Sequence, residues 1–137
     1  MGLEDLQSAL SSYRTQLANK RAEQRGYYDK ADEIRAVYNE LAGRKSVLEG
    51  YRNTVSTFSE STYGDFVGNV FTTTYVPKVE ELVSYYNTVI DNVDTNLDNL
   101  NNEVTRYENL GLQCDGPIGY LASVVNSLIG QIQNWVN

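Results

Sequence analysis

An apolar repeat with alternating steps of three and four residues constrains the fold of this chain more than any other feature. It starts at Leu3 and continues for about eight heptads, which is the pattern of a coiled-coil seam. The seam positions are Leu3, Leu6, Leu10, Tyr13, Leu17, Lys20, Gln24, Tyr27, Ala31, Ile34, Tyr38, Leu41, Lys45, Leu48, Tyr51, Val55 and Phe58. The repeat predicts one long helix over residues 3–58. Its polar members are of the kind that fixes register or partner choice.

Three glycines interrupt this first helical pattern, at Gly26, Gly43 and Gly50. Each costs about 1 kcal/mol in a helix interior relative to alanine. They leave open whether the helix is straight or bent at these positions.

A second repeat follows a segment rich in turn-forming residues. Residues 59–65 predict a turn, and residues 66–110 predict a second helix. Pro77 indicates either a fresh helix start or a kink at that point. The seam of this helix consists of Val79, Leu82, Tyr86, Ile90, Val93, Leu97, Leu100, Val104 and Tyr107.

A third repeat lies near the C-terminus. Residues 111–117 contain two glycines and a proline and predict a loop. Residues 118–136 then predict a helix of about 30 Å, with the stripe Ile118, Leu121, Val125, Leu128, Ile132 and Trp135. We therefore expect an all-α single domain over residues 1–137, in which a long antiparallel, coiled-coil-like helical hairpin carries a third C-terminal helix.

The composition argues against an enzyme. The chain has no histidine and one cysteine, Cys114, so histidine-based nucleophilic catalysis and histidine-ligated zinc are excluded. Asp115 beside the cysteine disfavours a reactive thiolate. The paired carboxylates Glu80–Glu81 and Asp91–Asp94 have no EF-hand loop around them. We expect no cofactor, no metal and no small-molecule substrate.

The charge is divided unevenly along the chain. Residues 1–60 hold nine Lys/Arg and nine Asp/Glu, whereas residues 61–137 hold two Lys/Arg and nine Asp/Glu, which accounts for the net charge of −7. An acidic chain cannot neutralise phosphates, so nucleic acid is not an expected partner. The acidic region is either a solvated helix face or a surface for a basic partner. The last helix lacks the Lys/Arg typical of membrane-surface helices, which disfavours a membrane partner.

A two-helix hairpin is thin and leaves part of each seam uncovered. We therefore expect another helical chain to complete the core, either a different protein or a second copy. Tyrosine is also enriched at interfaces. The residues expected to form partner or packing interfaces are Tyr27, Ile34, Tyr38, Leu41, Tyr86, Ile90, Leu97, Leu121, Val125, Leu128, Ile132 and Trp135.

The predicted turn carries a short motif with a family resemblance. In the run Tyr63-Gly64-Asp65-Phe66-Val67-Gly68-Asn69, Phe66 and Gly68 match the Trp-x-Gly motif of the WXG family of type VII secretion, with Phe in the place of Trp. The long hairpin and extra helix are more similar to the small α-helical partners encoded beside LXG toxins in Gram-positive type VIIb systems. This resemblance implies a targeting partner or chaperone that binds the helical LXG domain of a toxin, with a second small helical protein as a further partner.

Export signals in these families include Tyr-x-x-x-Asp after the second helix. Here Tyr28 and Asp32 fit that spacing but lie within the first predicted helix. No cleavable signal peptide is visible, so the resemblance implies a cytoplasmic complex with its partner, with leaderless export as the open question. Two other interpretations stay open: a WXG-like secreted homodimer with a structural or surface role, and a membrane-active helical protein.

Overall fold

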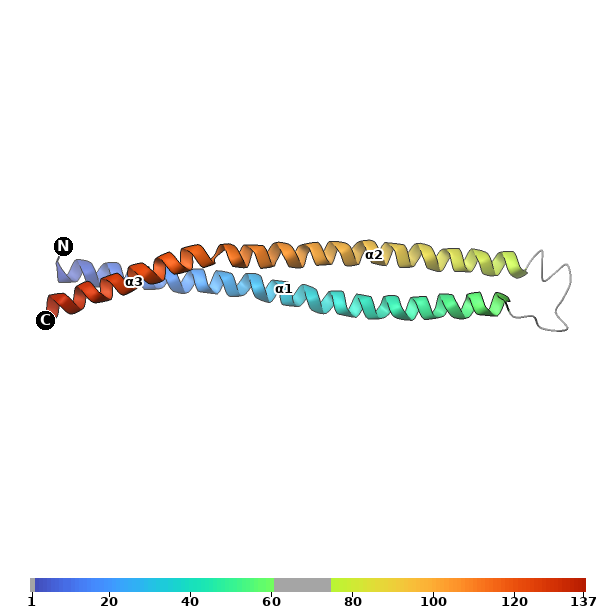
Figure 1. Ribbon diagram of the computed structural model, residues 1–137, viewed down its shortest axis with the longest axis horizontal. Helices are drawn as coiled ribbons and strands as arrows, with labels where there is room; N and C mark the ends of the chain where they lie inside the picture. The colour runs from blue at the N-terminus through green and yellow to red at the C-terminus, as the bar shows by residue number, and fades with distance from the viewer. Residues whose placement is uncertain (1, 61–74) are drawn as a thin grey trace. The chain divides into compact units, whose positions relative to one another are not determined.

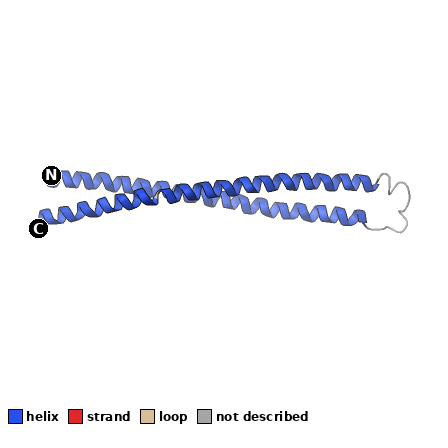
Figure 2. Cartoon of the chain, turned by 45° about the horizontal axis from the view of Figure 1, so that its top comes forward, coloured by secondary structure: helices blue, strands red, loops and turns tan. Residues whose placement is uncertain are grey.

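The protein consists of three α-helices. The computed structural model describes residues 2–60 and 75–137, and in these ranges the chain forms α1 (Leu3–Glu60), α2 (Val76–Gln113) and α3 (Asp115–Val136) (Figure 1). Figure 2 shows no strand among the described residues. The predicted all-α class, a helical hairpin with a third helix, is confirmed.

The first helix extends without interruption through its three glycines. It ends at Glu60, two residues beyond the predicted boundary. A Cβ atom added at Gly26, Gly43 or Gly50 would meet nothing within 4 Å, so no tertiary contact requires glycine there. The helical pattern of the seam therefore overrides the local preference of these residues.

The predicted turn and the start of the second predicted helix fall largely outside the described residues. This applies to Phe66 and Gly68 of the resemblance motif. As described, α2 begins at Val76 and carries Pro77 in its first turn. Proline is accommodated there because the first N–H groups of a helix have no intrahelical acceptor.

The prediction of a loop over residues 111–117 was wrong. Helix α2 continues to Gln113 and α3 begins at Asp115, which leaves Cys114 alone between them. Gly111 and Cys114 are both buried, at positions that continue the three–four repeat from Tyr107 to Ile118. The glycine and proline residues suggested a loop, but the uninterrupted apolar period kept the chain helical.

The chain divides into two compact units, each made of paired helical segments. One comprises Met1–Ile34 with Glu103–Asn137, and the other comprises Arg35–Asn102. In the first unit, α3 and the end of α2 pair with the N-terminal part of α1. In the second unit, the rest of α1 pairs with the first part of α2. Both α1 and α2 contribute to both units.

The core of the first unit is a narrow apolar cluster between α1 and α3. Leu17, Leu121 and Val125 are each at most 9% exposed, and Leu10 and Ile118 pack against them. Burial at about 25 cal/mol per Å² stabilises such a cluster. A two-helix layer gives each side chain neighbours on only one side, so many other seam residues stay half-buried.

In the second unit, the seam differs from the predicted one at two positions. Tyr51 is 57% exposed, whereas Arg52 is half-buried. Leu82 is 46% exposed, whereas Val83 is half-buried. At both places the buried seam keeps the strict alternation of three- and four-residue steps. Tyr51 and Leu82 therefore lie outside the seam. The side chain of Phe58 lies outside the described part of the chain.

Candidate interaction surfaces

The twelve residues predicted to form interfaces differ in exposure. Five are buried: Ile90, Leu97, Leu121, Val125 and Leu128. Six are half-buried: Tyr27, Ile34, Tyr38, Leu41, Tyr86 and Ile132. Only Trp135 is exposed, at 57%. The buried members therefore serve packing within this chain, and the exposed apolar surface consists mainly of other residues.

An apolar stripe on α2 is part of that exposed surface. We call Leu82, Tyr85 and Val89 the outer stripe; they are 46%, 70% and 39% exposed. Their spacing of three and four residues places them on one face of the helix. Together with Leu48 and Tyr86 they line a small open groove of about 130 Å³. The groove lies within the second unit, and every residue that lines it is apolar or aromatic.

Polar contacts also join the helices of the second unit. Lys45, a polar seam residue, forms an ion pair with Asp94. The hydrogen bond with Asp94 is the main reason that the pKa of Lys45 is raised. Arg52 donates a hydrogen bond from Nη1 to Asn87 Oδ1 over 3.1 Å. Such cross-helix contacts favour one pairing register over its alternatives.

Gln24, another polar seam residue, joins the helices of the first unit. Its Nε2 donates to the carbonyl of Gly111 over 3.0 Å and to Oδ1 of Asp115 over 2.7 Å. We call these two bonds the Gln24 clasp. One N–H of the amide serves each acceptor, so a half-buried polar group is satisfied at the point where α2 gives way to α3.

Tyr28 lies against Gly111 at the same point. A Cβ atom on Gly111 would lie 2.5–2.9 Å from three carbons of the Tyr28 ring. The glycine is therefore required by close packing, because its missing side chain makes room for the ring. Tyr28 of the predicted export motif thus has a packing role in α1, while Asp32 is exposed on the same helix.

A group of tyrosines and charges occupies a neighbouring part of the first unit. The rings of Tyr27 and Tyr107 are 6.4 Å apart between centroids, and the Arg106 guanidinium lies 4.3 Å above the Tyr107 ring. The Tyr27 hydroxyl donates to Glu23, which also accepts from Lys20. The bond from Lys20, followed by that from Tyr27, lowers the pKa of Glu23.

The hydrogen bonds of Glu23 and Glu103 predict a loss of stability in acid. Arg106 lowers the pKa of Glu103 by hydrogen bonding, as Lys20 and Tyr27 lower the pKa of Glu23. Both carboxyls therefore have folded-state pKa values below the ordinary range. Each contributes stability above its unfolded pKa, and that contribution disappears as the pH falls through the lower folded pKa. We expect the midpoint of urea unfolding to decrease from pH 7 to about pH 3, and to decrease less in Glu103→Gln. Glu81→Gln, which removes an α2 carboxylate without touching the Arg106 pair, is the control. Identical pH profiles for Glu103→Gln and the wild type would contradict the assignment.

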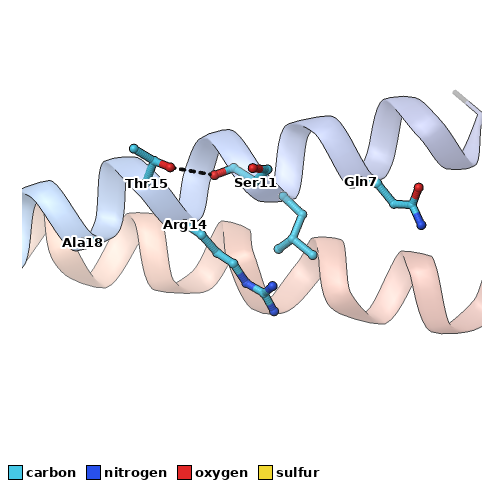
Figure 3. Close-up of a pocket in the computed structure, with 6 residues that line it drawn as sticks. Gln7, Ser11, Arg14, Thr15 and Ala18 are labelled. Carbon is cyan, nitrogen blue, oxygen red and sulfur yellow. Dashed lines mark hydrogen bonds between the residues drawn. The ribbon is translucent and has the colours of Figure 1, made fainter.

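A larger hollow on α1 does not have the form of an enclosed ligand site. It measures about 480 Å³ and is lined by Gln7, Leu10, Ser11, Arg14, Thr15 and Ala18. All six residues belong to one helix, and Figure 3 shows Arg14 extending towards the ribbon of α3. Small-molecule pockets bury most of their ligand's surface. A hollow walled by a single helix leaves a ligand open to solvent on its other sides.

The fold defines the class of protein: an all-α helical hairpin with a third helix. No protein-family model, curated protein or solved structure matches this chain. Within the described ranges, no helix combines the length and apolarity needed to cross a membrane. No group of three or more metal-ligating side chains occurs in the same ranges.

The outer stripe and the clasp were not recognised as sites in the sequence. Leu82 and Tyr86 were identified, but as seam residues; Tyr85 and Val89 flank the seam and gave no periodic signal. For the clasp, the signal was present: Gln24 is a polar seam residue, and Gly111 continues the repeat of the second helix. That Gln24 lies opposite Gly111 follows only from the register between α1 and α2, which the sequence does not give.

Proposed function

We propose that this protein is a non-enzymatic partner protein that binds the helical N-terminal LXG domain of a toxin and directs it to type VIIb secretion. The observation that carries the proposal is the outer stripe of Leu82, Tyr85 and Val89 beside Leu48. It is an apolar surface on α2 that no third helix covers among the described residues of its unit. An exposed patch of this kind marks an interaction site.

A helix suits this groove better than an extended peptide. The groove follows the line where α1 and α2 meet, and its apolar positions on α2 repeat every three to four residues. An amphipathic helix presents side chains at the same period, so its anchors fill such a groove in register. The result is a local bundle in which the seams of both proteins are better covered than in either protein alone.

The acidic charge of α2 supports recognition of a particular partner. Lys45 and Arg106 pair with Asp94 and Glu103, but Glu80, Glu81, Asp91 and Asp98 are exposed acidic side chains on the same helix. Complementary charge on a partner accelerates its association and suppresses wrong partners more than it adds affinity. The apolar stripe supplies the affinity, and the charge supplies the selection.

The direct experiment is co-expression of the full chain with the LXG domain encoded by the adjacent gene, with a tag on the LXG domain only. Co-purification of the untagged chain in a defined stoichiometry supports the proposal. Failure to co-purify contradicts it. A stable homodimer by light scattering, with no affinity for the LXG domain, favours the alternative of a homodimeric structural protein.

Leu82→Ser is expected to reduce capture by the LXG domain about ten-fold or more, because it places a polar group at the centre of the apolar contact. Its effect on the free energy of unfolding should be about 1 kcal/mol or less, because the side chain is already half exposed. The matched control is Leu112→Ser, which changes the same residue type at a 57% exposed position in the other unit. Binding by microscale thermophoresis and unfolding in urea measure the two effects. Equal loss of binding in both variants would argue against the outer stripe.

A further inference from the structure

The connection between α2 and α3 is weaker than a continuous helix. The N–H of Cys114 donates to the carbonyl of Gly111 over 3.1 Å, a tighter three-residue turn, and the N–H of Ile118 donates to the carbonyl of Cys114. Pro117 has no N–H to donate to the carbonyl of Gln113, and its ring crowds that carbonyl. At least one helical hydrogen bond is thus missing where the two helices meet.

The Gln24 clasp bridges this interruption from the opposite helix. It contacts Gly111 at the end of α2 and Asp115 at the start of α3, and Tyr28 packs into the space left by Gly111. Gln24 and Tyr28 both belong to α1. Side chains of α1 therefore connect the end of α2 to the start of α3, where a backbone hydrogen bond between these two helices is missing.

Beyond Asp115, α3 is held to α1 mainly by apolar contacts. Residues 116–137 carry no charged side chain, so no side-chain ion pair connects them to α1. The contacts are those of Leu121 and Val125 with Leu17 and its neighbours. Released from α1, a helix of 22 residues would be marginally stable in water, because isolated helices depend on packing of their apolar face.

We infer that α3 undocks and unfolds as a separate unit about Cys114, and that the Gln24 clasp is the latch that holds it closed. Opening would uncover the seam residues Leu17 and Leu121 while the end of α2 stays paired with α1. The inference concerns the free protein and does not depend on the proposed partner.

Hydrogen–deuterium exchange of the full-length protein under native conditions tests this. The amides of residues 118–136 in α3 should exchange about ten-fold or more faster than those of residues 103–110 in α2, because their opening is sub-global. Gln24→Leu should accelerate exchange in α3 about ten-fold, since Asp115 loses its donor on α1 and the Gly111 carbonyl keeps only the N–H of Cys114, and should change α2 less than about two-fold. Asp115→Ala removes only the α3 half of the clasp and should have a smaller effect of the same kind.

Gln16→Leu is the matched control. Gln16 lies on the same helix and donates to Ser12 of that helix, so its replacement should leave exchange in α3 unchanged. Equal protection of α2 and α3 in the wild type would overturn the inference, because it would mean that both helices open only in global unfolding. An equal acceleration of both helices by Gln24→Leu would overturn the role of the latch.

Discussion

Leu121→Ala is expected to destabilise the protein by about 2–3 kcal/mol. Leu121 is 9% exposed and packs against Leu17 and Val125 in an apolar cluster between α3 and α1. Truncation removes transfer free energy and leaves a cavity that the surrounding residues fill only in part. The value lies towards the lower end for buried leucines, because a two-helix core can relax more than a multilayer core.

Chemical unfolding in urea, followed by helical circular dichroism, measures this change. Tyr120→Ala is the matched control, because the neighbouring side chain is 65% exposed and its loss should change the free energy of unfolding by about 0.5 kcal/mol or less. Trp135→Ala should behave like the control, since Trp135 is 57% exposed despite its place in the predicted stripe. Equal effects of Leu121→Ala and Tyr120→Ala would contradict the packing described for α3.

Gly111→Ala is expected to destabilise the protein by about 1–2 kcal/mol, although alanine is the better helix former. The substitution gains up to about 1 kcal/mol of helix propensity. It also places Cβ 2.5–2.9 Å from the Tyr28 ring, and relieving such overpacking costs about 1–3 kcal/mol. Gly111 does not adopt the left-handed backbone, so the cost comes from the ring and not from the dihedral angles.

The same change at a glycine of α1 should have the opposite sign. Gly43→Ala meets no atom within 4 Å and should stabilise the protein by about 0.5–1 kcal/mol through helix propensity. In a Tyr28→Ala background, Gly111→Ala should no longer destabilise, because the ring that it would strike is gone. Stabilisation by Gly111→Ala in the wild type would refute the close packing of Tyr28.

The junction of α2 and α3 is where the structure departs most from the predicted elements. Gly111, Gly116 and Pro117 are turn-forming residues, and they led to the prediction of a seven-residue loop. The apolar period nevertheless passes through Gly111 and Cys114 without a change of phase. The proline removes one helical hydrogen bond, which weakens the helix near Cys114. Packing of the seam keeps the residues on both sides helical, so the interruption is limited to Cys114.

The candidate sites were harder to predict than the helices. The sequence marked Gln24 and Lys45 as polar seam residues, and both form cross-helix contacts in the structure. Their partners Gly111, Asp115 and Asp94 could not be named, because a heptad repeat allows several registers that differ by seven residues. The outer stripe was missed for a related reason: Leu82 fits the seam nearly as well as Val83 does.

The apolar period by itself determined the helices of this protein, because residues that repeat every three to four positions lie on one face only in a helix, and that face is stable only when it is packed. It also determined that the chain forms a hairpin with a third helix. The tertiary structure decided which residues face each other. Register depends on contacts between residues distant in sequence, such as the Tyr28 ring against Gly111 and the Gln24 amide between α2 and α3, and these contacts exist only once the helices are paired.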